Sequence, residues 1–221
     1  MSGPMGVMST KIAIAASALL VSARVDMHEV WAILDPSAPV SRVTPDIARR
    51  LRAADDAASQ PVTLSRGHVV GLDHEEMRLG RIIVVPNQKR DLVIGSDILS
   101  EMALELDFRG GRLRVLERGA LQHRTAKMTP VAAHVSADGC LSLAGTGPDG
   151  MTLRVALDGS AERPTGMPAP VQLGAVHLMA SRSGTHGGRC DANDVVLDWR
   201  AFSDQVVILD LGNNTLWVSA G

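Results

Sequence analysis

The chain has 221 residues, a length that suits one large domain or two small ones. Hydrophobic residues make up 45% of it and charged residues 21%, so it can bury a core and global disorder is excluded. The 22 Lys and Arg nearly balance the 24 Asp and Glu, which argues against nucleic-acid or membrane partners. Two Cys exclude a disulfide-dense scaffold and a four-cysteine zinc site, and with no Tyr and two Phe the core must be aliphatic.

The first apolar run has two interpretations. Lys11 precedes the apolar run Ile12–Val21, and the small residues up to Ala23 resemble a signal-peptidase site. The run is shorter than the ~20 residues of a membrane-spanning helix. We favour a strand at Leu19–Val25, because cleavage after Ala23 would remove half of a hairpin completed by Val30–Leu34. The cytoplasm is the default compartment, and a secreted or periplasmic location is the alternative.

The rest of the chain consists mainly of short apolar runs separated by Gly, Pro and Asp turns, which predicts a mainly β fold. Two short helices interrupt the strands. One begins after Thr44 with Pro45 in its first turn, and the other covers Ser96–Met102. The remaining predicted strands are Val62–Leu64, His68–Leu72, Arg81–Val85, Leu104–Phe108, Leu113–Leu116, Cys140–Ala144, Leu153–Leu157, Val171–Leu173, Val176–Met179, Val206–Asp210 and Leu216–Ser219.

Two segments recur in the same order. Ile33–Ala38 is echoed by Ala156–Ala161, with an offset of 158 − 35 = 123 between their Asp residues. Leu104–Val115 is echoed by Val207–Val218, with an offset of 210 − 107 = 103. This order predicts a duplicated lobe whose second copy is 123 − 103 = 20 residues shorter between the two motifs. We expect lobes at 1–118 and 130–221, joined by a polar linker at 119–129.

These motifs resemble those of aspartic peptidases of the pepsin and retropepsin type. In that family an apolar strand ends in Asp-Thr/Ser-Gly, and a Gly-x-Asp-hydrophobic segment with a hairpin follows later. Ile33–Ala38 resembles the first feature, and Val93–Leu99 followed by Leu106–Leu113 resembles the second. In the second half Asp198 stands where the Gly is expected. The resemblance implies two similar β-barrel lobes with a peptide-binding cleft between them.

The chemistry of such a cleft needs two carboxylates that share one proton, one acting as base on a water and the other as acid. Asp35 and Asp158 match these positions, since each follows an apolar strand and precedes small residues. We expect their carboxylates within a few ångströms of each other. The alternative is that both are ordinary turn-initiating Asp residues.

The sequence departs from the family pattern beside each Asp. Pro36 and Gly159 replace the hydroxyl residue, and Ser37 and Ser160 replace the Gly. A side chain restricts the backbone where Gly is permissive, and Pro lacks an N–H. The hydroxyls of Ser37 and Ser160 are candidate substitutes at the substrate-binding site. A substrate-covering flap is expected from Ala57–Gly71, with Gly67 as its flexible point, and an ordinary hairpin loop is the alternative.

Other site types find no support. Gly145–Gly150 matches G-x-G-x-x-G but precedes a strand, so we interpret it as a turn. The histidines and Cys190 do not match a zinc pattern, and no cofactor or metal is expected. Asp97, Asp107 and Asp210 are interpreted as helix caps or strand ends. Cys140 and Cys190 are either bridged or both free.

Three functions remain open. The first is an aspartic endopeptidase that hydrolyses peptide bonds through Asp35 and Asp158. The second is an inactive relative that binds extended peptides in the interlobe cleft by strand addition. The third is an unrelated all-β binding or structural protein. For the first two we expect a monomer whose partner is a peptide or protein.

Overall fold

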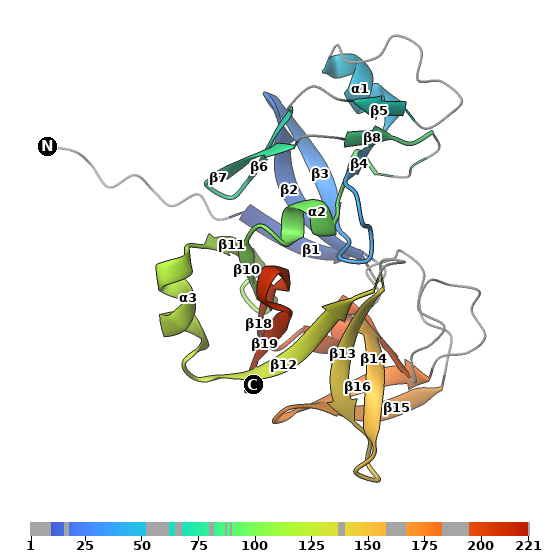
Figure 1. Ribbon diagram of the computed structural model, residues 1–221, viewed down its shortest axis with the longest axis vertical. Helices are drawn as coiled ribbons and strands as arrows, with labels where there is room; N and C mark the ends of the chain where they lie inside the picture. Colours follow the sequence, from blue (N-terminus) through green and yellow to red (C-terminus); the bar gives the residue numbers. More distant parts are fainter. Residues whose placement is uncertain are drawn as a thin grey trace, which may run out of the picture.

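The computed structural model describes residues 10–15, 18–51, 62–64, 68–79, 82–86, 88, 90–136, 140–157, 167–182 and 195–220. The expected mainly β fold is confirmed (Figure 1). The first half contains β1 Thr10–Ala15, β2 Ala18–Val25, β3 His28–Leu34, β4 Arg42–Val43, β5 Val62–Leu64, β6 His68–Leu72, β7 Glu75–Leu79, β8 Ile82–Val84, β9 Leu92–Ile94, β10 Ala103–Asp107 and β11 Arg112–Leu116.

The second half contains β12 Met128–Val135, β13 Leu141–Thr146, β14 Thr152–Leu157, β15 Pro168–Leu173, β16 Val176–Arg182, β17 Val195–Leu197, β18 Val206–Asp210 and β19 Thr215–Ser219. The α-helices are α1 Pro45–Arg50, α2 Ser96–Leu99 and α3 Arg118–Thr125. Two 3-10 helices are η1 Trp199–Phe202 and η2 Leu211–Asn213. No described helix has the length and apolar character needed to cross a membrane.

The helix α1 begins as its sequence predicts. The Thr44 hydroxyl accepts a hydrogen bond from the backbone N–H of Ile47 at 3.3 Å, and Pro45 occupies the first turn, where its missing N–H costs nothing. Ile47 and Ala48 are buried against the first half of the chain. Capping and one buried face therefore fix this short helix.

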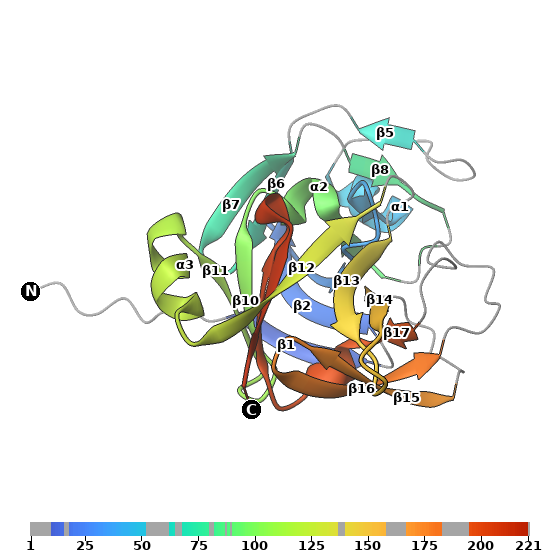
Figure 2. The same ribbon diagram turned by 60° about the horizontal axis from the view of Figure 1, so that its bottom comes forward.

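One antiparallel sheet joins the two halves. Its strands lie in the order β1, β11, β10, β18, β19, β12 (Figure 2). The central pair is β10 and β18, in which Glu105 lies opposite Ile208. The strands β11 and β19 flank this pair on either side, and β1 and β12 are the outermost strands.

The second half closes on itself. The strands β13, β14, β17, β16 and β15 pair in turn, and β15 returns to β13 through Thr146 and Gln172, so they form a small barrel. In the first half, β2, β3, β9, β4, β8 and β5 pair in that order, and the β6–β7 hairpin joins through β2. Each half contains one parallel pair next to a candidate Asp motif, β3 with β9 and β14 with β17.

The polar segment expected as a linker contains a helix and the start of a strand. The helix α3 covers the sheet that joins the halves, where Leu121 packs against a small core of Ala103, Leu116 and Ile208. Its Arg124 lies 3.3 Å from the Glu105 carboxylate. Among the α3 side chains that the structure describes, Leu121 packs on this small core and Arg124 forms the ion pair, so the helix has no apolar stripe that the sequence could show.

The main core runs through both halves without interruption and is largely aliphatic, as the composition predicts. Its aromatic part is a cluster of Phe108, Trp199 and Phe202, with ring centroids 6.0–6.4 Å apart. Trp199 and Phe202 are fully buried. These rings bring η1 of the second half against the end of β10 of the first half, so the halves share a core as well as a sheet.

Cys140 is buried and disulfide-bonded, while Cys190 lies outside the described residues. The chain contains only these two Cys. We therefore expect denatured, unreduced protein to contain no free thiol, measured by thiol titration with and without reductant. Gel electrophoresis without reductant separates an intramolecular bridge from a disulfide-linked dimer, and two free thiols per chain would refute the bridge.

Candidate functional site

Asp35 directly follows Leu34, the fully buried last residue of β3. The backbone N–H of Asp35 donates to the carbonyl of Ile94 at 3.0 Å, which extends the parallel pairing of β3 and β9 by one step. The carbonyl of Asp35 then accepts from the N–H of Ala38 at 3.0 Å and closes a turn. The side chain is 14% exposed. The strand pairing therefore delivers a nearly buried carboxylate to one fixed position.

Ser37 holds one oxygen of this carboxylate. Its backbone N–H donates to Asp35 Oδ1 at 3.0 Å, and its hydroxyl donates to the same oxygen. The other oxygen, Oδ2, lies 3.7 Å from Nη2 of Arg42. In the first half, the Ser that replaces the family's Gly thus supplies a hydroxyl donor where Pro36 has none. No motif in the sequence indicates Arg42 as a site residue.

A buried hydrogen-bond network supports the turn that carries Asp35. Ser41 is fully buried, and its hydroxyl donates to Asp97 Oδ1 at 2.7 Å and accepts from the N–H of Gly95 at 2.9 Å. The Ser41 N–H donates to Asp97 Oδ2 at 3.0 Å. Asp97 was expected as a cap, but the N-cap of α2 is Gly95, and Asp97 lies in the first turn and links α2 to the segment before β4. The Gly-x-Asp motif of the sequence includes Asp97, but no sequence motif includes Ser41.

Close approach explains the Gly in this motif. A Cβ at Gly95 would lie 2.5 Å from the carbonyl oxygen of Ala38, a backbone atom with little freedom to move. The N–H of Ser96 donates to that same oxygen at 2.7 Å. Gly95 therefore lets the Asp35 turn rest directly on the start of α2.

The network yields a stability prediction. Ser41→Ala leaves the N–H of Gly95 without its partner, while Oδ1 of Asp97 keeps the N–H of Ile98, and one unpaired buried group costs about 1–3 kcal/mol. We expect the free energy of unfolding to fall by about that amount in urea titration. Ser22→Ala, on the exposed face of β2, is the matched control and is expected to change it by less than about 0.5 kcal/mol. Equal stability of both variants would contradict the role given to Ser41.

In the second half the corresponding strand ends at Leu157, which pairs in parallel with Leu197 of β17. Asp158 and Ser160 lie outside the described residues. Asp198, in place of the expected Gly, caps η1, where its Oδ1 accepts from the N–H of Arg200 at 2.8 Å. Hydrogen bonding from the Arg200 side chain to Asp198 raises the pKa of that guanidinium above its ordinary value. The Asp that replaces the expected Gly therefore caps η1 and binds the Arg200 side chain.

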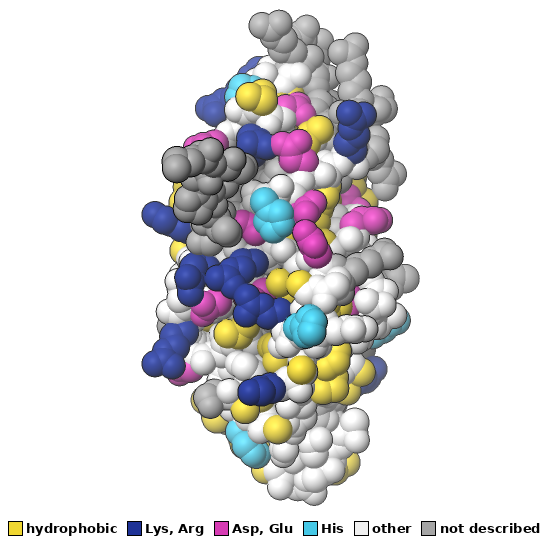
Figure 3. Space-filling view, turned by 90° about the vertical axis from the view of Figure 1, so that its left-hand side faces the viewer, with side chains coloured by type: hydrophobic (Ala, Val, Ile, Leu, Met, Phe, Trp, Pro, Cys, Tyr) yellow, Lys and Arg dark blue, Asp and Glu magenta, His cyan; other side chains and the backbone are white. Residues whose placement is uncertain are grey.

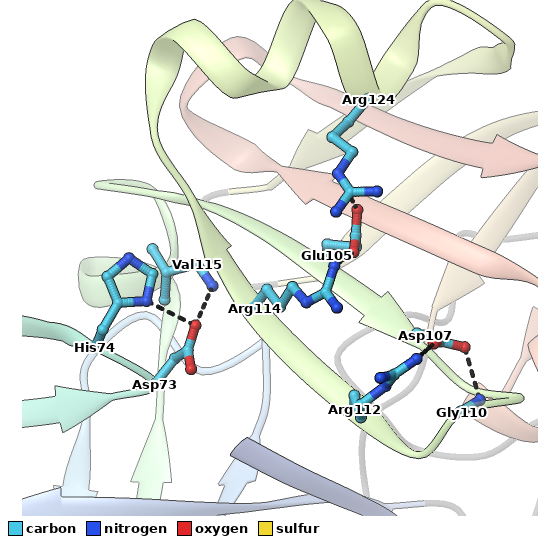
Figure 4. Close-up of polar contacts among 9 residues, drawn as sticks. All are labelled: Asp73, His74, Glu105, Asp107, Gly110, Arg112, Arg114, Val115 and Arg124. Carbon is cyan, nitrogen blue, oxygen red and sulfur yellow. Dashed lines mark hydrogen bonds and ion pairs between the residues drawn. The ribbon is translucent and has the colours of Figure 1, made fainter. Parts of the chain in front are cut away.

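The predicted flap is described only in part. Gly67 lies outside the described residues, and Gly71 lies beside Arg24 of β2. The following turn packs on β1 and β11, because the N–H of Asp73 donates to the Thr10 hydroxyl at 3.0 Å and Asp73 Oδ2 accepts from the N–H of Val115 at 3.2 Å. The same Oδ2 lies 2.8 Å from Nδ1 of His74 (Figure 4). The end of the β6–β7 hairpin is therefore attached to the sheet, and a flap stays a prediction for the segment before β6.

A second polar cluster consists of Glu105, Arg114 and Arg124. Buried Glu105 lies between Arg114 of β11, at 3.4 Å, and Arg124 of α3, at 3.3 Å (Figure 4). Lys and Arg side chains gather in the middle of the face shown in Figure 3. Within the described ranges, no three His, Cys, Asp or Glu side chains are arranged to hold a metal ion. This cluster anchors α3 to the sheet.

Comparisons with known proteins give a likeness of fold. No protein-family model matches the chain, and no curated protein matches it. Among solved structures, it is similar to the retroviral protease-like domain of Ddi1 from Leishmania major, with 21% identity and a TM-score of 0.36 over 46% of this chain and 96% of that one. It is also similar to a retropepsin-like aspartic protease from Rickettsia conorii, with 18% identity and a TM-score of 0.35 over 51% of this chain and 96% of that one.

Proposed function

We propose that the chain is an aspartic endopeptidase-like hydrolase in which Asp35 and Asp158 activate a water molecule. The observation that carries this proposal is the matching register of two parallel strand pairs. Leu34 pairs with Ile94, and Leu157 pairs with Leu197. Asp35 and Asp158 directly follow Leu34 and Leu157, so each comes after the fully buried last residue of a strand that has a parallel partner.

The same offsets support an internal duplication. From Leu34 to Leu157 the offset is 157 − 34 = 123, and from Ile94 to Leu197 it is 197 − 94 = 103. These are the offsets of the two sequence repeats. The central sheet agrees, because β10 and β18 pair so that Glu105 lies opposite Ile208, the residue 103 positions later. A two-fold axis through that pair would relate the halves and bring the two strand ends toward each other.

The chemistry follows from a shared proton. One carboxylate of the dyad takes a proton from water, which attacks the peptide carbonyl, and the other protonates the leaving amine. Ser37 holds Oδ1 of Asp35 with two donors, so Oδ2, which lies 3.7 Å from Nη2 of Arg42, is the oxygen that would act on the water together with the second carboxylate. The disulfide at Cys140 supports an oxidising compartment for the protein, in favour of the secreted or periplasmic alternative.

Replacement of either carboxylate tests the dyad. Asp35→Asn and Asp158→Asn are each expected to lower kcat/KM on an unstructured protein substrate by at least about 100-fold, because general acid and base catalysis is lost. The double variant should be no slower than the single ones, since the pair acts as one unit. Asp46→Asn, on the exposed face of α1, is the control. Activity that survives both single replacements would exclude the dyad.

A second function is favoured by the residues beside Asp35. Pro36 has neither an N–H nor a hydroxyl, so this loop lacks the donors that the family uses to lock its two Asp loops together. A chain with this defect could retain the cleft and bind extended peptides without cleaving them. Strand addition would then supply the affinity.

Restoration of the family residues separates the two functions. The variant carries Pro36→Thr, Ser37→Gly, Gly159→Thr and Ser160→Gly. Because the Ser37 hydroxyl already binds the Asp35 carboxylate, we expect an active wild type and a lower kcat in the restored protein, measured with a fluorogenic peptide. An inert wild type and an active restored protein would instead identify a peptide-binding relative on a competent scaffold.

A further inference from the structure

Arg42 lies on the same face of the sheet as the candidate catalytic Asp. The strand β9 runs between β3 and β4, and its Val93 pairs with Ile33 on one side and Arg42 on the other. Asp35 follows Ile33 by two residues, and side chains two apart in a strand point the same way. The guanidinium of Arg42 can therefore reach past the end of β9 to the Asp35 carboxylate.

Two N–H donors of the Arg42 guanidinium lack a good hydrogen-bond acceptor in this position. Nη2 lies 3.7 Å from Asp35 Oδ2, too far for a good hydrogen bond. Nε is buried and has no hydrogen-bond partner. Nε and Nη2 form one edge of the planar guanidinium, which matches the two oxygens of a carboxylate. Among the described residues, Asp35 provides the one carboxylate within 4.0 Å of Arg42.

Asp35 does not depend on Arg42 for its orientation. Its Oδ1 is held by the backbone N–H and hydroxyl of Ser37, and its backbone N–H is bonded to Ile94. The Arg42 side chain is 30% exposed, so it has room to turn toward the solvent side. The carboxylate of a bound peptide could therefore bind the Arg42 guanidinium while Ser37 keeps the Asp35 carboxylate in place.

We propose that Arg42 selects peptides with an Asp or Glu side chain beside the cleaved bond. This inference rests on the proposed function, because it places the peptide against Asp35. In the free protein the guanidinium faces Oδ2 of Asp35. When an acidic peptide binds, its carboxylate takes Nε and Nη2 of Arg42, and Oδ2 becomes free for the water and the second carboxylate. The permanent charge of Arg makes this preference insensitive to pH above the range in which the peptide carboxylate protonates.

The test uses peptide pairs that differ only by Glu or Gln at each position flanking the cleaved bond. One set is fluorogenic and reports kcat/KM. The other carries a non-cleavable bond and reports Kd by calorimetry. We expect Glu to be preferred by about 10- to 100-fold at one position, the range of a charge-assisted bidentate contact. Arg42→Gln should abolish the preference, Arg42→Glu should reverse it toward Lys peptides, and Arg42→Lys should keep part of it.

Arg24→Gln, which removes an exposed guanidinium from β2, is the matched control and should leave the preference unchanged. Cleavage with equal preference for Glu and Gln at every position would overturn the role of Arg42 while the peptidase function stands, and equal binding without cleavage would overturn both. A Glu preference in Kd without cleavage would instead support Arg42 and remove the peptidase function. If the wild type neither binds nor cleaves any peptide of either set, both proposals fail.

Discussion

The antiparallel pairing of β10 with β18 is the contact on which the rest of the structure depends. This pair joins the strands of the two halves into one sheet. On one side β11 and then β1 pair outward from β10, and on the other side β19 and then β12 pair outward from β18. In the register of this pair Glu105 lies opposite Ile208, the residue 103 positions later. The aromatic cluster of Phe108, Trp199 and Phe202 then fills the space beside it.

That central pair also explains an ionic feature that differs between the halves. At the same level of the sheet one half has Glu105 and the other has Ile208, and both are nearly buried. A buried carboxylate needs partners, since losing its hydration is costly. Arg114 and Arg124 supply them, and Arg124 in turn fixes α3 over the sheet. The position of α3 therefore follows from one acid that the second half does not share.

Much of the strand pattern was predictable, because β5 and β6 have clear turn residues around them and α1 has a cap at Thr44. The strand β7 was missed because its exposed residues, Glu76 and Arg78, alternate with half-buried Glu75 and Met77, so few apolar residues mark it, and α3 was missed because it has no apolar stripe. In the site, the contact of Ser37 with Asp35 spans two residues and was open to sequence reasoning. The contact of Ser41 with Asp97 spans 56 residues and depends on strand register, which one sequence does not display.

The halves share backbone pairing more than they share side-chain chemistry. Asp198 stands 103 residues after Gly95, and Arg200 stands 103 residues after Asp97. Asp97 accepts a hydrogen bond from Ser41, whereas Arg200 donates to Asp198, the N-cap of its own helix. Strand register is kept because a slip of one residue would turn every core side chain outward. Loop chemistry is free of that constraint. The turn that carries Asp35 is consequently fixed by bonds within the first half, through Ser41, Gly95 and Asp97.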